Sequence, residues 1–115
     1  MLLTPREVVM SYIEAMDKRD YAAARNRLGD LVRVKGPGGE GFRGPDEFLS
    51  MMEKQRGTYD IKKVFVDNED VCVLYDFVTP TLRTFFCSWY QLKDGKIVSI
   101  QTVFDPRAFA APAGQ

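Results

Sequence analysis

The sequence contains no histidine and only two cysteines, Cys72 and Cys87. The lack of histidine excludes serine–histidine–aspartate and cysteine–histidine catalysis, and the usual zinc ligand sets cannot be assembled either. No other motif for a metal or a cofactor is present, so we expect that the protein needs neither. We predict two free thiols that act as small core or interface residues in a reducing compartment.

The sequence also lacks a charge bias and a long apolar run. Sixteen basic and sixteen acidic residues give a formal net charge of zero, without the dense lysine and arginine cluster that phosphate contacts need. No apolar run approaches the ~20 residues of a membrane span, and the first residues do not resemble a signal peptide. We therefore predict a cytoplasmic protein that binds neither nucleic acid nor membrane, folded as a single domain over residues 1–115.

Helical periodicity dominates the first half of the chain. Thr4 and Pro5 are typical of a helix start, and apolar residues then recur at helical spacing to about Lys18. Asp20 is suited to cap a second, short helix that ends at Gly29. Gly44 and Pro45 open a third helix. The glycine-rich loop over residues 36–44 either rims and closes a cavity or is a solvated connection.

From Thr58 onward the pattern changes to the period of two that is typical of strands. Residues 71–92 contain the longest β-branched and aromatic run, which Thr79-Pro80-Thr81 divides into two strands joined by a turn. A last strand follows Gly95, and residues 105–115 are expected to be a partly ordered tail. Helices first and an antiparallel meander last predict an α+β fold, with three N-terminal helices on one face of a curved antiparallel sheet.

The central hairpin is apolar at odd and even positions alike, so both of its faces need cover. Suppose that the two strands pair so that the numbers of opposite residues add up to about 160, which sets residue 76 opposite residue 84. The even-numbered residues then face the helices, and the two cysteines lie on opposite faces of the sheet. The odd positions are too apolar to stay wet in a monomer. We therefore predict a homodimer through the face that carries Tyr75, Phe77, Phe85, Cys87 and Trp89.

Asp76 is the one carboxylate on the face that this register turns toward the helices. Burial without a cationic partner would raise its pKa toward the range of a general base. Around it we expect a small-molecule pocket of apolar walls and hydroxyl groups, lined by Tyr12, Leu74, Phe86, Ser88, Tyr90, Ile100, Thr102 and Phe104. A structural interpretation stays open, in which Asp76 pairs with Arg83 or a helix arginine, or bonds Thr84, and fixes the strand register.

The order of helices, glycine-rich loop and strands, with FRGPDEF at the third helix and DGKIVSIQTVFDP at the end, resembles the nuclear transport factor 2-like superfamily. That superfamily includes SnoaL-like polyketide cyclases and ketosteroid isomerases. The resemblance covers about residues 5–106 and implies a cone-shaped, cystatin-like α+β fold with an apolar cavity open at one end. It also implies that dimers are frequent.

Within this superfamily Tyr12 is similar in position to the helix-one tyrosine that helps to form the oxyanion hole of ketosteroid isomerases. The aspartate that serves those enzymes as general base precedes a proline, where this chain has Gly36 before Pro37. Ser88 stands, with a one-residue gap, where the second oxyanion donor is expected. The resemblance therefore implies a related pocket without the isomerase mechanism.

Three function classes remain open. A cofactor-independent isomerase, cyclase or hydrolase would use Asp76 as general base and Tyr12 as hydrogen-bond donor to a developing oxyanion. A ligand-binding protein would hold a small apolar or amphipathic molecule and use the same hydroxyl groups only to orient it. An interaction domain would fill the cavity with side chains and act through its dimer face.

Overall fold

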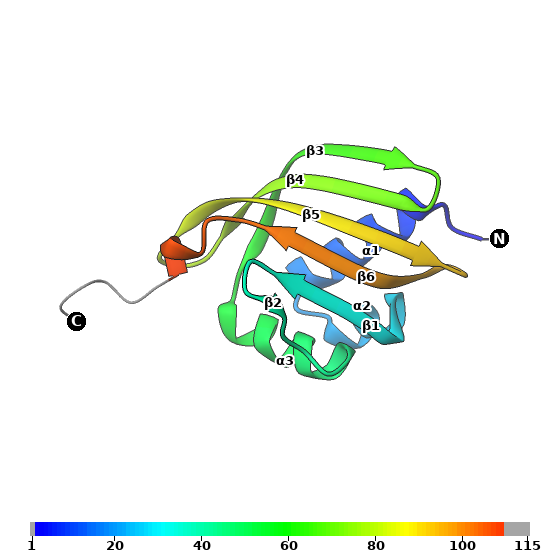
Figure 1. Cartoon of the computed structure of the whole chain (residues 1–115), viewed down its shortest axis with the longest axis horizontal. Coiled ribbons are helices and arrows are strands. Elements are labelled where there is room, and N and C mark those ends of the chain that lie inside the picture. The colour runs from blue at the N-terminus through cyan, green and yellow to red at the C-terminus, as the bar shows by residue number, and fades with distance from the viewer. Residues whose placement is uncertain (1, 110–115) are drawn as a thin grey trace.

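The computed structural model describes residues 2–109. The helices are α1 (Pro5–Asp17), α2 (Tyr21–Arg27), α3 (Pro45–Gln55) and a final 3-10 helix, η1 (Pro106–Phe109). The strands are β1 (Leu28–Gly36), β2 (Gly39–Glu40), β3 (Thr58–Asp67), β4 (Asp70–Val78), β5 (Arg83–Lys93) and β6 (Lys96–Val103). Figure 1 shows these elements along the chain.

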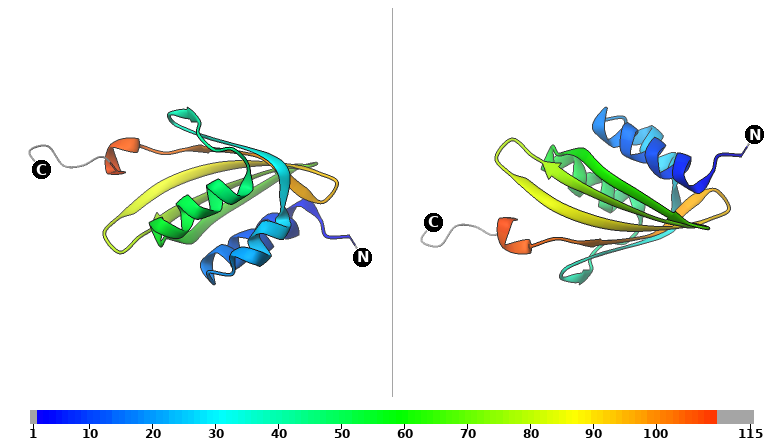
Figure 2. Two further views of the ribbon diagram at one scale, coloured as in Figure 1. Left: turned by 90° about the horizontal axis from the view of Figure 1, so that it is seen from below. Right: turned by 90° about the horizontal axis from the view of Figure 1, so that it is seen from above.

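The six strands form one sheet in the order β2-β1-β6-β5-β4-β3. The sheet curves, and the helices lie on its concave side (Figures 1 and 2). β3 to β6 pair as an antiparallel meander, whereas β1 pairs with β6 in parallel. The predicted α+β, cone-like architecture is therefore confirmed, with a mixed sheet in place of a wholly antiparallel one.

The start of α1 follows the sequence prediction closely. The Thr4 hydroxyl accepts a hydrogen bond from the Glu7 amide, and the Glu7 carboxylate accepts one from the Thr4 amide. This capping box satisfies two backbone donors that the first helical turn leaves unpaired. By contrast, α2 ends at Arg27, two residues before the predicted stop, because Leu28 and Gly29 already belong to β1.

The register of β4 against β5 differs by one residue from the predicted register. Val78 pairs with Arg83, so four residues, Thr79 to Leu82, form the connection in place of three. The Thr79 amide donates to the Leu82 carbonyl, and the Thr79 hydroxyl accepts from the Leu82 amide. A one-residue change in register turns every side chain of one strand to the other face.

This register corrects the predicted faces of β4. Tyr75 and Phe77 lie buried on the concave side, next to even-numbered residues of β5 such as Phe86. Asp76 and Leu74, both expected in the pocket, point to the convex side, as do Cys72 and Cys87, which therefore share one face.

The predicted dimer face is divided in the same way. Tyr75 and Phe77 belong to the core, whereas Phe85, Cys87 and Trp89 lie on the convex side. Phe65 of β3 and Val103 of β6 join them there by strand pairing. We call Phe65, Phe85, Trp89 and Val103 the convex apolar patch; their exposed fractions are 53%, 54%, 42% and 62%.

Two contacts attach the end of α1 to the start of β3. The Asp17 carboxylate accepts a hydrogen bond from the Tyr59 amide, at 2.9 Å, and the Arg19 guanidinium donates to the Gly57 carbonyl, at 2.7 Å. The position of Gly57 leaves no room for a side chain, because a Cβ atom there would stand 2.0 Å from the Phe77 ring. Phe77 therefore packs directly against the backbone at this junction.

No helix within residues 2–109 is both long and apolar enough to cross a membrane. The cytoplasmic location stays a prediction. Of the tail predicted over residues 105–115, Pro106–Phe109 form η1, and residues 110–115 lie outside the described part of the chain.

We predict that Gly57→Ala lowers the free energy of unfolding by about 1–3 kcal/mol, the usual cost of an overpacked core. The added methyl group forces the Phe77 ring away from its site. Gly41→Ala is the matched control, because no atom lies within 4 Å of a Cβ there and the backbone needs no positive φ. Denaturant titration measures both variants, and equal stability of the two would contradict the proposed contact.

The homodimer also stays a prediction, and its face is now the convex apolar patch. Light scattering is expected to show a dimer for the wild-type chain and a monomer for the double variant Phe85→Ser/Val103→Ser, because two large exposed apolar groups are removed. Leu31→Ser serves as control, since Leu31 is 89% exposed on β1 outside the patch. A monomeric wild-type chain would refute the prediction.

Candidate functional site

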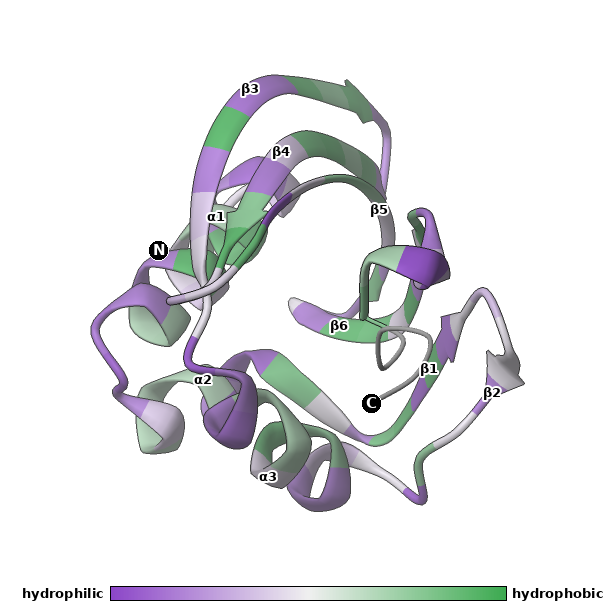
Figure 3. Cartoon of the chain, turned by 90° about the vertical axis from the view of Figure 1, so that its left-hand side faces the viewer, coloured by the Kyte–Doolittle hydropathy of each residue, from purple (hydrophilic) through white to green (hydrophobic). Residues whose placement is uncertain are grey.

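A cavity of about 280 Å³ lies between the concave face of the sheet, α1 and α3. This volume is near the lower end of the roughly 300–1,000 Å³ that is typical of ligand sites. Figure 3 shows the end of the molecule at which η1, α3 and the β1–β2 hairpin lie. Residues of all three segments line the cavity or its rim. The lining residues are Tyr12, Val34, Lys35, Gly36, Pro37, Phe42, Phe48, Met51, Met52, Gln55, Tyr59, Tyr75, Phe77, Phe86, Ser88, Tyr90, Ile100, Thr102, Phe104 and Phe109.

Aromatic rings form most of the wall on the sheet side. Phe86 and Phe104 stack with their ring centroids 4.2 Å apart, and Phe109 of η1 meets the Phe104 ring edge-on at 5.3 Å. Tyr59 and Tyr75 lie 4.8 Å apart farther along the sheet. Such packed rings make a rigid apolar surface that favours a flat, apolar ligand.

A chain of three hydroxyl groups crosses this wall. The Ser88 hydroxyl lies 2.8 Å from the Tyr75 hydroxyl and 2.8 Å from the Thr102 hydroxyl. Ser88 is only 1% exposed and is the one polar residue of the core within residues 2–109. Because the three groups satisfy one another, they tolerate burial and hold the facing side chains of β4, β5 and β6 in place.

Tyr12 of α1 contributes a fourth hydroxyl group, and it has no hydrogen-bond partner within the described residues. Its ring packs edge-on against that of Tyr90, with centroids 6.0 Å apart. The Tyr59 hydroxyl opposes the rise in the Tyr12 pKa, although the two groups do not meet the geometry of a hydrogen bond. A buried hydroxyl without a partner costs free energy, and a ligand oxygen at this place would remove that cost.

Burial raises the pKa of all four cavity tyrosines, Tyr12, Tyr59, Tyr75 and Tyr90, far above the usual value for a phenol. Nearby tyrosines add to the shift of Tyr12, and the Ser88 hydroxyl opposes the shifts of Tyr75 and Tyr90. The four phenols are therefore protonated at any physiological pH. They can donate hydrogen bonds to a ligand, but they cannot take up a proton as a base.

The structure brings most of the predicted site residues together. Tyr12, Phe86, Ser88, Tyr90, Ile100, Thr102 and Phe104 all line the cavity, whereas Asp76 and Leu74 do not. No aspartate or glutamate is among the described lining residues, and no cluster of three or more potential metal ligands occurs among residues 2–109. The cavity that the structure describes thus offers hydrogen-bond donors without a carboxylate base.

Tyr59, Tyr75 and Phe77 are cavity residues that the sequence analysis missed. Tyr75 and Phe77 were placed on the wrong face by the register of β4. Tyr59 lies at the cavity because it pairs with Phe77 across β3 and β4, just as Ile61 pairs with Tyr75. A correct turn length between β4 and β5 would have placed Tyr75 and Phe77, and the pairing of β3 with β4 would then have placed Tyr59.

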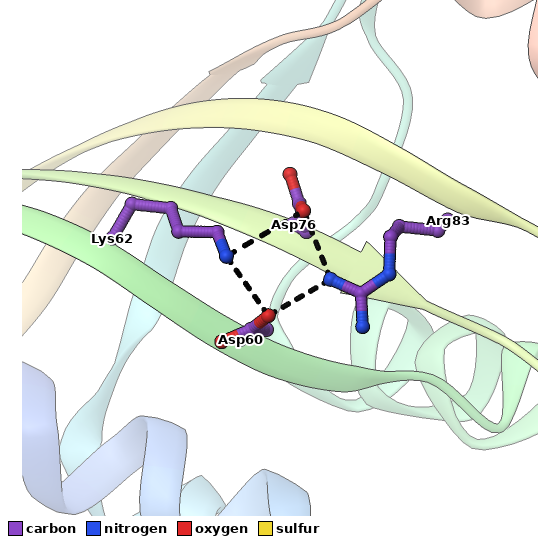
Figure 4. A network of polar contacts seen from close by, with 4 residues as sticks. All are labelled: Asp60, Lys62, Asp76 and Arg83. Atoms are coloured by element: carbon purple, nitrogen blue, oxygen red, sulfur yellow. Dashed lines mark hydrogen bonds and ion pairs between the residues drawn. The ribbon is translucent and has the colours of Figure 1, made fainter.

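Asp76 belongs to a group of four charged residues on the convex side (Figure 4). The Arg83 guanidinium lies 2.9 Å from the Asp76 carboxylate and 2.8 Å from that of Asp60. Lys62 completes the group, 3.1 Å from Asp60 and 3.8 Å from Asp76. Hydrogen bonds from Arg83 and Lys62 lower the Asp60 pKa. Asp76 therefore has Arg83 and Lys62 as ion-pair partners, and the pairing with Arg83 is the one that the structural interpretation names.

The chain has recognisable relatives in both sequence and structure. Residues 9–100 match the family model of the SnoaL-like domain. An NTF2-like protein of unknown function from Cytophaga hutchinsonii is 30% identical, with a TM-score of 0.88 over 95% of this chain and 96% of that one. No curated protein sequence matches the chain.

Two more distant structures share the fold. A protein from Kribbella flavida described as a proposed ketosteroid isomerase is 18% identical, with a TM-score of 0.81 over 96% of this chain and 83% of that one. A proposed polyketide cyclase from Sinorhizobium meliloti is 17% identical, with a TM-score of 0.74 over 83% of this chain and 92% of that one.

We predict that Asp76→Asn lowers the free energy of unfolding by no more than about 1 kcal/mol, because the Arg83 side chain is 56% exposed and keeps Asp60 as a partner. Ser88→Ala is expected to cost about 1–3 kcal/mol, since it leaves the buried Tyr75 hydroxyl unpaired. Denaturant titration near neutral pH compares the two. A loss of ~3 kcal/mol or more for Asp76→Asn would show that its ion pair is part of the core.

Proposed function

Because the chain belongs to the SnoaL-like domain family, we propose that it binds a small, mainly apolar molecule that carries one hydrogen-bonding oxygen. The observation that supports this most directly is the unpartnered Tyr12 hydroxyl, buried at the wall of an otherwise apolar cavity. Tyr12 donates to the ligand oxygen, and the aromatic rings contact the rest of the ligand. No cofactor takes part in this binding.

Two features of the cavity define the ligand class. Its walls are mainly apolar, and the only charged residue among the described lining residues is the exposed Lys35, so a positively charged group would lose its hydration without an opposite charge in return. Its volume of about 280 Å³ suits a molecule of one or two fused rings. Aryl ketones and related carbonyl compounds of that size combine both requirements.

The choice between binding and catalysis depends on the absence of a carboxylate base from the described lining residues, whose one amine belongs to the exposed Lys35. Proton abstraction next to a carbonyl group needs a group with a suitable pKa within hydrogen-bond reach of the carbon-bound proton. Asp76 lies on the other face of the sheet, and the cavity tyrosines are held protonated. Binding without acid–base chemistry is therefore favoured over an isomerase, cyclase or hydrolase.

The test uses 1-tetralone and its hydrocarbon counterpart tetralin, which differ by the carbonyl oxygen. Titration followed by NMR chemical shifts is expected to show both binding the wild-type protein, with tetralone tighter by about 3- to 10-fold, the usual net value of one hydrogen bond. Tyr12→Phe removes the donor and keeps the ring, so it is expected to abolish the preference. Ile100→Ala, which enlarges the cavity without removing a hydroxyl group, is the control and is expected to retain the preference for tetralone.

Failure of both compounds to shift the signals of cavity residues would reject the binding site. A preference that survives in Tyr12→Phe would reject Tyr12 as the donor. Exchange of the tetralone protons next to the carbonyl in deuterium oxide, recorded in the same samples, tests for catalysis. We expect no acceleration by the protein, and acceleration would overturn the non-catalytic proposal.

A further inference from the structure

Cys72 of β4 and Cys87 of β5 lie side by side on the convex side of the sheet. Their sulfur atoms are 3.4 Å apart, and both residues are partly exposed. The strand pairing sets Cys72 opposite Trp89 and Leu74 opposite Cys87, so the two cysteines are diagonal neighbours. This arrangement follows from the same register that turns Asp76 away from the cavity, and it is independent of ligand binding there.

We propose that Cys72 and Cys87 form a reversible disulfide by exchange with a low-molecular-weight disulfide such as oxidised glutathione. In the first step one protein thiolate attacks a sulfur of that disulfide, which releases one glutathione thiol and leaves a mixed disulfide. In the second step the other protein cysteine attacks the protein sulfur of the mixed disulfide and releases the second glutathione thiol. Two protein thiols are oxidised and one small disulfide is reduced.

The geometry supports the second step in particular. Because β4 and β5 pair along their length, the two thiols stay together in the folded state and their reaction is intramolecular. Diagonal cross-strand positions are farther apart than directly opposite ones. Exposed or strained disulfides are the ones that small thiols reduce readily. The positions of Cys72 and Cys87 therefore favour a disulfide that small thiols can reduce again over a permanent one.

Either cysteine can make the first attack, and the other, whose sulfur lies 3.4 Å away, resolves the mixed disulfide. Burial, together with the Cys87 thiol beside it, raises the pKa of Cys72 to about 11, so little of Cys72 is thiolate near neutral pH and its attack is slow.

Cys87 lies between Phe85 and Trp89 of the convex apolar patch, so a dimer through this patch would cover the cysteine pair, and the exchange is a reaction of the monomeric chain. A disulfide there would fix β4 against β5 behind these side chains. Trp89 is the only tryptophan of the chain and stands opposite Cys72, so its fluorescence reports directly on the bond, because disulfides quench a neighbouring indole.

The experiment incubates the reduced, folded chain with oxidised glutathione near neutral pH, quenches with acid and measures the intact mass. We expect a product that is lighter than the reduced chain by two hydrogen atoms, with a cross-linked peptide joining Cys72 to Cys87. Trp89 fluorescence falls as this product forms, and dithiothreitol restores both the mass and the fluorescence.

Single variants assign the steps and keep the proposal falsifiable. Cys72→Ser and Cys87→Ser are each expected to accumulate a mixed disulfide on the remaining cysteine, because the second thiol that would resolve it is missing. A wild-type product that retains glutathione, a disulfide between two chains, or thiols that react only after unfolding would each overturn the proposal. Circular dichroism of each variant establishes that it is folded before the assay.

Discussion

The pairing of β4 with β5 is the constraint on which the rest of the molecule depends. The connection from Thr79 to Leu82 contains four residues, and its internal hydrogen bonds set Val78 opposite Arg83. Side chains alternate along a strand, so this one length decides the face of every residue in β4. Tyr75 and Phe77 thereby reach the cavity, while the charged and thiol groups of β4 are directed outward.

Among the described residues that line it, the resulting cavity has several hydroxyl groups and no carboxylate. Ser88 joins two neighbouring hydroxyls into a satisfied chain, and Tyr12 is left with a donor and no partner. Neutral hydroxyl donors in an apolar wall can orient a ligand oxygen. The chain shares its fold with proteins described as a proposed ketosteroid isomerase and a proposed polyketide cyclase, and a shared fold does not by itself carry an activity.

The carboxylate of Asp76 and the two thiols, which could act chemically in a cavity, lie instead on the convex side of the sheet. Asp76 is held by Arg83 and Lys62 in an ion-pair group that also contains Asp60. Beside this group lie the convex apolar patch and the adjoining cysteine pair. Charged groups, apolar area and the two thiols thus occur together on the face of the sheet opposite the cavity.

Local sequence determined much of this structure. The capping box of Thr4 and Glu7, the helical spacing that includes Tyr12, and the period of two after Thr58 depend on neighbouring residues only, and each predicted its element correctly. The even-numbered residues of β5 and Ile100 were placed correctly for the same reason. The parallel pairing of β1 with β6, the face of Asp76 and the proximity of the two cysteines were decided only in the tertiary structure. Each depends on which residue of one strand pairs with which residue of another. One residue more or less in a turn moves every side chain of a strand to the other face, and the hydrophobic period along the strand does not reveal the length of the turn.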